Sequence, residues 1–298
     1  MKYKLTIALI TMNRAEQLKL AIESCVAATL PSETQFVIVD NASTDHTEEV
    51  VKSMKDSISH DLVYRKESVN LGVGGGRNVC FDLAEGEYIY FFDDDAEIPE
   101  ELRDTFFTTS IEFLDKNSQV ALLTTDIKDE VYGERVLVTA RHQTVENLKC
   151  AYTFHGGTTF ARKSSFASPM FMNIMYGNEE IAVSMGAFDR GYYSVYYPNV
   201  YILHKPKVDK WTGRDAEKIN LQGISNTYAI KKILYPSVLL PVLHLAYIRR
   251  LKKHNVTDKE QIKALKSKRK EFCKNNRVKK IKLGTVIKTY REFGLTVF

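Results

Sequence analysis

With 298 residues the chain is long enough to bury a large core, and a composition of 44% hydrophobic and 27% charged residues argues against a disordered or fibrous protein. Its four cysteines lie far apart without a CxxC spacing, which argues against a cysteine zinc site and a disulfide framework. The net charge of +5 predicts no partner by itself, but it is distributed unevenly along the chain.

Short apolar runs alternate with segments of helical spacing over the first hundred residues. The first two apolar runs cover residues 5–10 and 36–39, and their continuous hydrophobicity predicts parallel strands that are covered on both faces. Residues 62–65 and 88–92 are expected to be further strands, because the same alternation recurs there. Helical spacing covers residues 15–28, 47–54 and 77–84, with Thr44 or Asp45 as the cap of the second helix. This alternation predicts a doubly wound, Rossmann-like α/β sheet flanked by helices.

The pattern loosens beyond residue 100. We expect a helix over residues 100–116, followed by strands over residues 120–126, 135–139, 156–161 and 200–203. Helical spacing returns over residues 219–234 and 258–275, and Pro236 and Pro241 are expected to break the chain between them. The chain is therefore divided into a domain over residues 1–220 and a helical region over residues 221–298.

The end of the chain is strongly basic. Residues 1–230 carry 23 Lys and Arg against 33 Asp and Glu, whereas residues 231–298 carry 19 against 4. Such a tail favours an anionic membrane surface as its partner, and a solvated or oligomer-forming surface is the main alternative. Nucleic acid is not expected, because the basic residues are not interleaved with the aromatic residues or glycines of an RNA-binding module.

An apolar stretch over residues 233–248 precedes several basic residues, Arg249, Arg250, Lys252 and Lys253. It is shorter than the roughly 20 residues that span a bilayer. A helix lying in the membrane interface fits better, and a buried helix that ends in a basic turn is the alternative. The apolar run near the N-terminus is too short for a signal peptide, so we expect a cytoplasmic protein, peripheral at the inner face of the plasma membrane.

Three carboxylates, those of Asp93, Asp94 and Asp95, follow the fourth predicted strand. Adjacent carboxylates repel one another unless a cation or hydrogen bonds compensate their charge. Mg²⁺ and Mn²⁺ take carboxylate and phosphate oxygens together. A metal that bridges a diphosphate is therefore one interpretation, and an acidic loop without a ligand is the other.

Polar side chains also follow the first two predicted strands. They are Thr11, Asn13 and Arg14 after the first strand, and Asp40, Asn41 and Ser43 after the second. The carboxyl ends of the strands form the rim at which such sheets bind ligands. Asp40 is not needed to cap the next helix and is available to a base or a ribose.

A glycine-rich segment over residues 70–78 leads into the third predicted helix. Its glycines allow a close approach to a ligand, and the start of a helix favours an anion. The spacing matches neither the dinucleotide fingerprint nor a P-loop, so the segment alone is a weak signal.

Four motifs together resemble the family 2 glycosyltransferases with the GT-A fold. They are TMNR at 11–14, VDNASTD at 39–45, NLGVGGGRN at 70–78 and FFDDDA at 91–96. The resemblance covers roughly residues 4–100, and it implies that residues 1–220 form a GT-A catalytic domain. It also implies that Asp40 binds the nucleobase, that Asp93 contacts the ribose or the diphosphate, and that Asp95 ligates the metal.

A nucleotide-sugar site and a metal site follow from this resemblance. The expected nucleotide-sugar site comprises Thr11, Asn13, Arg14, Asp40, Asn41, Ser43, Asn70, Gly75, Arg77, Asn78, Asp93, Asp94 and Trp211. The expected metal ligands for Mn²⁺ or Mg²⁺ are Asp95, Asp93 and His204, although a lone histidine after a strand is usually structural. Trp211 offers either a surface for stacking on the sugar or an anchor in the core.

Glu179 and Glu180 resemble the acidic catalytic motif of the family, which usually reads Glu-Asp. Matching by position makes Glu180 the expected general base, with Glu179 orienting the acceptor. Without the resemblance, two carboxylates at the start of a helix are more often partners of the helix dipole. The segment from His155 to Gly157 is similar to the part that lines the acceptor side.

We therefore expect an inverting glycosyltransferase that moves a hexosyl or deoxyhexosyl group from a UDP- or dTDP-sugar to a glycan or lipid-linked acceptor. The family and the basic tail together favour assembly of cell-envelope polysaccharide. A sugar-nucleotide nucleotidyltransferase and a non-catalytic scaffold of a membrane glycan-assembly complex are the alternatives. The tail helices also leave a homo-oligomer open.

Overall fold

The computed structural model describes the chain except residues 130, 132, 207–215, 257 and 277, and only the backbone of residues 134, 216–220 and 259. Its strands are β1 (Tyr3–Thr11), β2 (Thr34–Asp40), β3 (Asp61–Lys66), β4 (Gly86–Asp93), β5 (Ala96–Glu97), β6 (Val120–Asp129), β7 (Gly133–Glu134), β8 (Thr139–Val145), β9 (Leu148–Ala151), β10 (Thr158–Arg162) and β11 (Tyr193–His204). The α-helices are α1 (Ala15–Val26), α2 (Thr47–Met54), α3 (Gly72–Leu83), α4 (Phe106–Lys116), α5 (Glu180–Asp189), α6 (Ala216–Leu234), α7 (Leu240–Lys253), α8 (Lys259–Asn275) and α9 (Leu283–Phe293). Short 3-10 helices are η1 (Glu100–Leu102), η2 (Lys163–Ser165), η4 (Ser237–Leu239) and η5 (Gly294–Val297).

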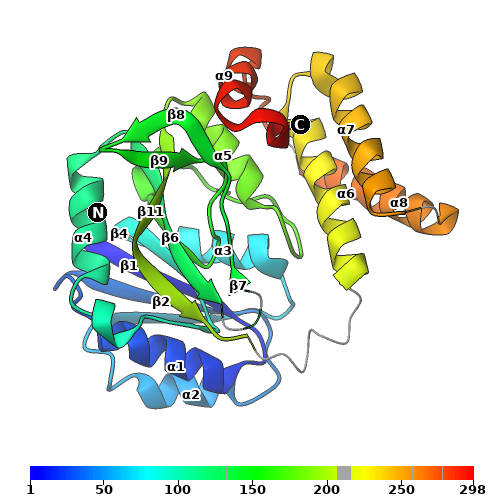
Figure 1. The fold of residues 1–298 in the computed structure, drawn as a ribbon. Coiled ribbons are helices and arrows are strands. Elements are labelled where there is room, and N and C mark those ends of the chain that lie inside the picture. Colours follow the sequence, from blue (N-terminus) through cyan, green and yellow to red (C-terminus); the bar gives the residue numbers. More distant parts are fainter. Residues whose placement is uncertain (130, 132, 207–215, 257, 277) are drawn as a thin grey trace.

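One mixed sheet runs through the molecule in the order β3-β2-β1-β4-β10-β6-β11-β9-β8 (Figure 1). The first four strands in this order are parallel, whereas β10 is antiparallel to both β4 and β6. The predicted α/β sheet flanked by helices is confirmed. It is doubly wound only in its N-terminal half, because β10 enters between β4 and β6 in the opposite direction.

Helices cover both faces of the parallel strands, with α1 and α2 on one side and α3 on the other (Figure 1). Leu5, Ile7 and Leu9 of β1 pack with α1, whereas Ala8 packs with α3 in a second core. Successive side chains of a strand point to opposite faces. Both faces of β1 are therefore apolar, which explains the continuous hydrophobic runs of the sequence.

The helix predicted over residues 77–84 begins earlier than expected, because α3 includes the glycines predicted to form a loop. Glycine disfavours helices by about 1 kcal/mol per residue relative to alanine, so the sequence argued for a loop. Tertiary packing outweighs this low propensity and makes the glycines helical. A Cβ on Gly74 would lie 2.1 Å from the main-chain oxygen of Met172, so only glycines let residues 172–175 lie against the helix.

The strand predicted over residues 135–139 is wrong. Residues 135–138 have no regular structure, and Val136 is 85% exposed, so the apolar residues of this segment do not mark burial. The chain instead forms a hairpin of β8 and β9 that the sequence did not predict. The strand expected over residues 200–203 is part of the longer β11, and the helix expected over residues 100–116 is divided into η1 and α4.

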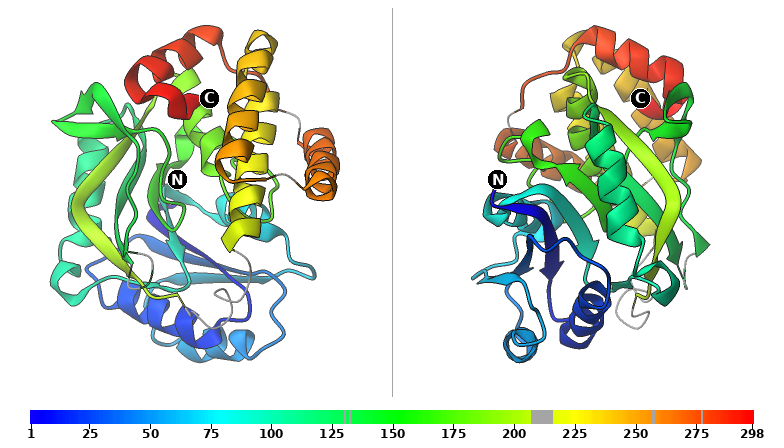
Figure 2. Two further views of the ribbon diagram at one scale, coloured as in Figure 1. Left: turned by 45° about the vertical axis from the view of Figure 1, so that its right-hand side comes forward. Right: turned by 90° about the vertical axis from the view of Figure 1, so that its left-hand side faces the viewer.

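Four α-helices follow β11 in the described part of the chain. Helix α6 packs against both α7 and α8, and α9 packs against β8 and α5 (Figure 2). Through α9 and η5, the residues Val286, Phe293 and Val297 join the core of the main body. The basic region is therefore helical, as predicted, and its last helix completes the core of the α/β part.

The apolar stretch over residues 233–248 is shared by α6, η4 and α7. Pro241 does not break the chain but is the second residue of α7, where a helix needs no backbone N–H donor. Within the described residues, no helix has both the length and the apolar character needed to cross a membrane. Val242 and Leu245 of α7 are exposed, whereas Leu243 and Tyr247 are buried.

Candidate active site

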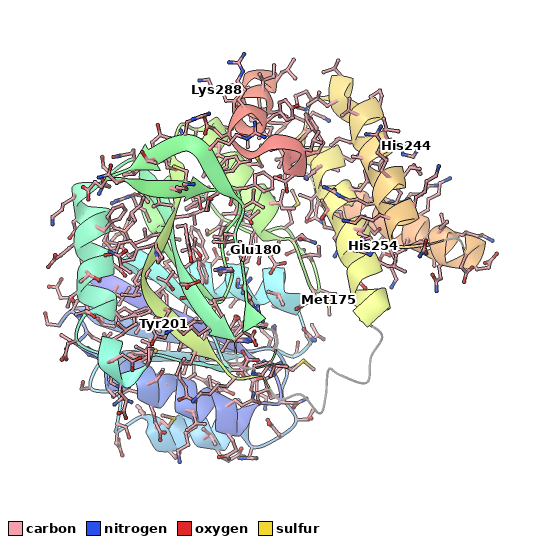
Figure 3. All side chains as sticks on the ribbon, in the orientation of Figure 1. Met175, Glu180, Tyr201, His244, His254 and Lys288 are labelled. Carbon is pink, nitrogen blue, oxygen red and sulfur yellow. The ribbon has the colours of Figure 1, made fainter. Side chains whose placement is uncertain are left out.

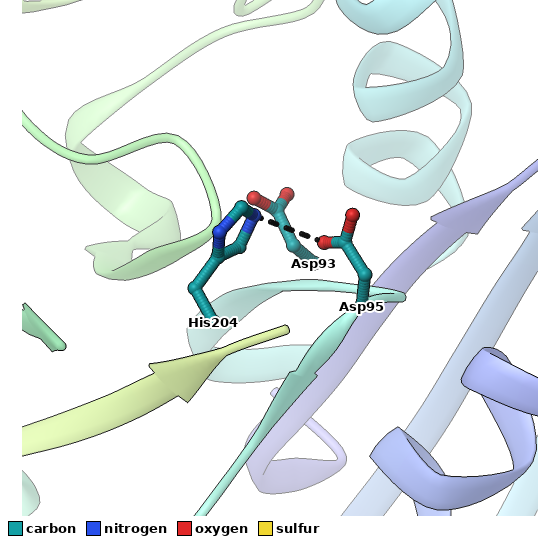
Figure 4. A group of neighbouring side chains, drawn as sticks. All are labelled: Asp93, Asp95 and His204. Atoms are coloured by element: carbon teal, nitrogen blue, oxygen red, sulfur yellow. Dashed lines mark ion pairs between the residues drawn. The ribbon is translucent and has the colours of Figure 1, made fainter. Parts of the chain in front are cut away.

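Asp93, Asp95 and His204 lie together where β4 and β11 end (Figure 4). His204 pairs with Ala96 of β5, which brings the end of β11 beside the acidic residues. One ligand atom from each of the three side chains lies within 4.8 Å of the others, and Nε2 of His204 is 3.2 Å from Oδ1 of Asp95. Two carboxylates and an imidazole at this spacing form a set of possible metal ligands.

A buried carboxylate orients His204. Nδ1 of the imidazole is 2.8 Å from Oδ2 of Asp129, which has no exposed side-chain surface and lies 2.7 Å from Arg135. In the neutral imidazole, a carboxylate at Nδ1 favours the tautomer whose lone pair is on Nε2, the nitrogen on the side of Asp95. Burial acts to lower the pKa of His204, but the hydrogen bond and charge of Asp95 raise it above its usual value, and in the protonated ring Nε2 donates to Asp95. The residues around His204 therefore fit a divalent metal.

Arg14 balances the charge of the acidic residues. Its Nη1 lies 2.8 Å from Asp94 and 2.7 Å from Asp95. Burial raises the pKa of Asp94 to about 6, with Arg14 opposing this and the charge of Asp95 adding to it. Burial also acts to raise the pKa of Asp95, but the hydrogen bond of His204 and the charge of Arg14 lower it below its usual value. Asp94 thus pairs with Arg14 and stands outside the metal-ligand group.

Arg77 connects the metal-ligand group with the predicted catalytic glutamates. Nη1 of Arg77 is 2.7 Å from Oε1 of Glu179 and 3.9 Å from Oε1 of Glu180, and its Nη2 is 3.4 Å from Asp93. Glu179 is buried, whereas 19% of the Glu180 side chain is exposed. Burial and the charge of Glu179 raise the pKa of Glu180 to about 8, despite the opposing charge of Arg77. Glu180 thus offers a carboxyl of high proton affinity at the start of α5.

Two glycines make room for these side chains. A Cβ on Gly157 would lie 1.8 Å from Oδ2 of Asp93, and a Cβ on Gly156 would lie 2.5 Å from Nη1 of Arg77. The main-chain oxygen of Gly157 also accepts a hydrogen bond of 3.1 Å from the nitrogen of Asp93. A side chain at either position would therefore displace Asp93 or Arg77 from the site.

Hydrogen bonds join the loops that follow β1 and β2. Oδ1 of Asp40 accepts from the nitrogen of Ser43 at 2.7 Å, and Oδ2 accepts from the hydroxyl of Tyr64 at 2.8 Å. Asn13 donates its main-chain N–H to Oγ of Ser43 at 2.9 Å and accepts from the nitrogen of Thr44 at 2.8 Å. Asp40 is fully buried, so its carboxylate holds the loop after β2 in place through these hydrogen bonds.

Two predicted nucleotide-site asparagines hold other parts of the chain. The side chain of Asn78 donates to the main-chain oxygen of Phe171 at 2.9 Å and accepts from its nitrogen at 2.8 Å. Nδ2 of Asn41 donates to the main-chain oxygen of Gly72 at 3.2 Å. These contacts fix α3 against the neighbouring loops.

The other predicted nucleotide-site residues differ in exposure. Asn70 is exposed and its Oδ1 accepts from the main-chain nitrogen of Gly72 at 2.8 Å, while Gly75 lies within α3 against Leu71. Thr11 is the buried last residue of β1, at the same edge of the sheet as Asp40. Trp211 lies outside the described residues.

A cavity of about 740 Å³ lies beside Glu180. Tyr152 and Asn178 line it from the main body, and Gln222 and Thr227 line it from α6. Its volume is within the range of pockets that hold small molecules. The predicted base therefore faces a space to which the C-terminal helices contribute.

Sequence reasoning missed three residues that position the site, namely Tyr64, Asp129 and Arg135. Asp129 ends β6, a strand that was expected to stop at residue 126, so its carboxylate was not placed at the sheet edge. Tyr64 reaches Asp40 from the neighbouring strand β3. A carboxylate at the end of a longer predicted strand would have been the signal for Asp129.

Residues 6–175 match the sequence profile of a family described as glycosyl transferase family 2. The chain belongs to this family. Among its relatives is the abequosyltransferase RfbV of Salmonella typhimurium, with 31% identity over 91 residues, or 30% of this chain and 24% of the relative. A second relative is the GalNAc(5)-diNAcBac-PP-undecaprenol beta-1,3-glucosyltransferase of Campylobacter jejuni, with 28% identity over 95 residues, or 32% of this chain and 30% of the relative. The matched segments thus span less than a third of either relative.

Solved structures with the GT-A fold resemble this family 2 chain over most of its length. S. aureus TarS in complex with UDP-GlcNAc covers 83% of this chain and 72% of its own, with a TM-score of 0.61 and 18% identity. A mannosyltransferase from Pyrobaculum calidifontis, in complex with GDP-Man and Mn²⁺, covers 100% and 86%, with a TM-score of 0.55 and 14% identity. The predicted GT-A fold is confirmed.

Proposed function

We propose that this family 2 chain is an inverting glycosyltransferase that moves a hexosyl or deoxyhexosyl group from a UDP- or dTDP-sugar to a hydroxyl of a glycan or lipid-linked acceptor. The observation that carries the proposal is the linkage by Arg77 of the Asp93-Asp95-His204 group to Glu180, which lines a cavity. The arrangement places a binding site for a diphosphate and a catalytic general base within one site. A relative named for an undecaprenol-linked acceptor and a structural neighbour solved with UDP-GlcNAc are consistent with the same activity.

Asp93, Asp95 and His204 would hold Mn²⁺ or Mg²⁺, and a solved structural neighbour contains Mn²⁺. A divalent ion bound there would neutralise charge on the leaving diphosphate. Asp129 and Arg14 contribute by fixing the orientation of His204 and the charge of Asp95.

Glu180 acts as the general base in this proposal. Its carboxylate accepts the proton of the acceptor hydroxyl, whose oxygen attacks the anomeric carbon from the face opposite the nucleoside diphosphate. The bond between this carbon and the diphosphate breaks, and the configuration is inverted. Glu179 is paired with Arg77 and buried, which supports a positioning role for Glu179.

The nucleotide is proposed to bind at the rim formed by the ends of β1, β2 and β4. Asp40 supports this rim by accepting hydrogen bonds from Ser43 and Tyr64. Its proposed contact with the nucleobase requires one of these two hydrogen bonds to be shared with, or replaced by, a hydrogen bond to the nucleobase. Asn13 and Arg14 lie on the same rim.

We also propose that residues 1–220 form the catalytic domain and that the basic helices bring it to an anionic membrane surface at the cytoplasmic face. Val242, Leu245, Arg249 and Lys252 of α7 are exposed, and their spacing places them along one face of the helix. Exposed apolar and basic side chains on one helical face favour binding in a membrane interface.

Calorimetric titration with UDP and dTDP, with and without Mn²⁺, tests the nucleotide and metal parts of the proposal. A screen of UDP- and dTDP-sugars by nucleotide release then identifies the donor. Failure of both nucleotides to bind in the presence of Mn²⁺ would contradict the proposed function.

A further inference from the structure

The cavity beside Glu180 carries an excess of positive charge. Four basic side chains line it, those of Lys231 on α6, Arg250 and Lys253 on α7, and His254 directly after α7. We call these four residues the basic cluster. Glu180 is the one carboxylate among the described residues that line the cavity.

The basic cluster comes from two helices that approach the cavity together with the main body. Glu180 lies at the start of α5 in the main body, and His254 lies beyond the end of α7 (Figure 3). Lys231 is 1% exposed and donates to the main-chain oxygen of Thr296 at 2.8 Å. Lys231 is therefore the buried member of the basic cluster, whereas Lys253 and His254 are exposed.

Arg250, Lys253 and His254 make no ion pair with an acidic side chain in the part of the chain that the structure describes. The dipole of α7 favours basic residues in its last turn, and it accounts for Lys252 as well. It does not account for the convergence of two of them with Lys231 of another helix on one cavity. Arg250 and Lys253 supply positive charge without an acidic partner among the described residues, whereas burial and the charge of Arg250 lower the pKa of Lys231 well below its usual range, so Lys231 contributes as an N–H donor. Two cations gathered in this way favour the binding of an anion.

We propose that this cavity is the acceptor site and that the basic cluster binds a phosphate or diphosphate group of the acceptor. The proposal rests on the proposed function, because it is Glu180 that marks the cavity as the place where the acceptor hydroxyl is deprotonated. The acceptor is then held at two points, its anionic group on the basic cluster and its hydroxyl at Glu180. The C-terminal helices thereby select the acceptor, while the N-terminal strands hold the donor.

The test is calorimetric titration of the full chain with inorganic pyrophosphate in EDTA, which removes divalent metal from the Asp93-Asp95-His204 group. The test variant carries Arg250→Gln and Lys253→Gln. The matched control carries Arg249→Gln and Lys252→Gln, which removes the same charge from the same helix at positions that do not line the cavity. We expect the Kd for pyrophosphate to rise at least tenfold in the test variant and to change less than twofold in the control.

Equal affinity in the two variants, or no binding of pyrophosphate by the unmodified chain, would overturn the inference. A parallel titration with UDP and Mn²⁺ reports on the proposed function separately, since the basic cluster is outside the nucleotide rim. Retained UDP binding in the test variant also shows that it is folded.

Two further probes identify the source of the phosphate. Farnesyl diphosphate represents a lipid-linked diphosphate, and N-acetylglucosamine 1-phosphate represents a phosphorylated glycan. Whichever binds more tightly than pyrophosphate to the unmodified chain, and loses affinity in the test variant by as much as pyrophosphate does, names the acceptor class. An affinity for both probes that is unchanged in the test variant would contradict a role for the basic cluster in acceptor binding.

Discussion

Arg77 and Glu179 form a buried ion pair of 2.7 Å, although 102 residues separate them in the sequence. The pair joins α3, which covers one face of the parallel strands, to the start of α5, where Glu180 lies. Their side chains are 7% and 4% exposed. A change in either partner is therefore transmitted to the proposed base and to Asp93.

We expect Arg77→Met to destabilise the protein by about 3 kcal/mol or more, because it leaves Glu179 buried without a partner. The double variant Arg77→Met, Glu179→Met should recover much of this loss, since it removes both charges. Urea denaturation of the two single variants, the double variant and the unmodified chain measures the coupling. Additive losses in the double variant would show that the pair does not act as a unit.

Glu180→Gln is expected to lower turnover by about 10²- to 10⁴-fold, the usual contribution of general-base catalysis, because the amide cannot accept the proton. UDP binding should stay within a factor of about two, since Glu180 is not part of the nucleotide rim. Glu180→Asp should keep more activity than Glu180→Gln, because it retains a carboxylate. Steady-state kinetics with the donor found by screening, together with UDP titration, measures both effects, and full activity of Glu180→Gln would remove Glu180 from the mechanism.

The pH dependence follows from the raised pKa of Glu180, which burial and the charge of Glu179 bring to about 8. Only the deprotonated carboxylate accepts a proton, so kcat/KM should rise with pH and level off above about 8. The same shift makes the folded state bind its proton more strongly than the unfolded state, so the contribution of Glu180 to stability falls as pH rises from about 4.5 to about 8.

Glu179→Gln removes one cause of the raised pKa and should move the midpoint of the kcat/KM profile to lower pH. The residual activity of Glu180→Gln serves as the control, because it should lack this ionisation. An unchanged midpoint in Glu179→Gln would assign the ionisation to another group.

The sequence predicted the parts of the site that belong to local motifs. Asp93 and Asp95 follow an apolar strand, and Asp40 and Asn13 follow two others, so the parallel sheet places them on one rim. His204 could be proposed only through the family resemblance, because its approach to Asp95 depends on β5 pairing with β11.

Contacts between residues far apart in the chain could not be predicted from local sequence patterns. Asp129 holds His204 across 75 residues, and the cavity joins Glu180 to Arg250 and Lys231 of the C-terminal helices. Helix propensity predicts a loop for the glycines before Arg77, because it carries no information about the segment that packs on them. Such features depend on tertiary packing, which a pattern of nearby residues does not encode.

Removal of the exposed charges of α7 by Arg249→Gln and Lys252→Gln should weaken binding to anionic vesicles by about tenfold or more, at roughly 1 kcal/mol for each basic residue. Binding to neutral vesicles should be weak and unaffected. Sedimentation with phosphatidylglycerol vesicles at low and high salt measures this effect, which salt should reduce. The variant with Arg250→Gln and Lys253→Gln is the matched control, and an equal loss in both variants would make the effect one of net charge alone.

Asp129→Asn tests the metal site without changing a proposed ligand. The carboxylate of Asp129 lies 2.8 Å from Nδ1 of His204, and loss of such a partner typically lowers metal affinity by about 10- to 100-fold. We expect Mn²⁺-dependent UDP binding to weaken by this order, while Asp95→Asn should abolish the dependence on Mn²⁺. Electron paramagnetic resonance of Mn²⁺ bound with UDP reports on the site directly. Asp129 contacts His204, Arg135 and the main-chain nitrogen of Val131, and of these only His204 is a proposed metal ligand. The double variant His204→Ala, Asp129→Asn should therefore bind UDP in the presence of Mn²⁺ as tightly as His204→Ala alone. A further loss of this affinity in the double variant would show that Asp129 does not act through His204.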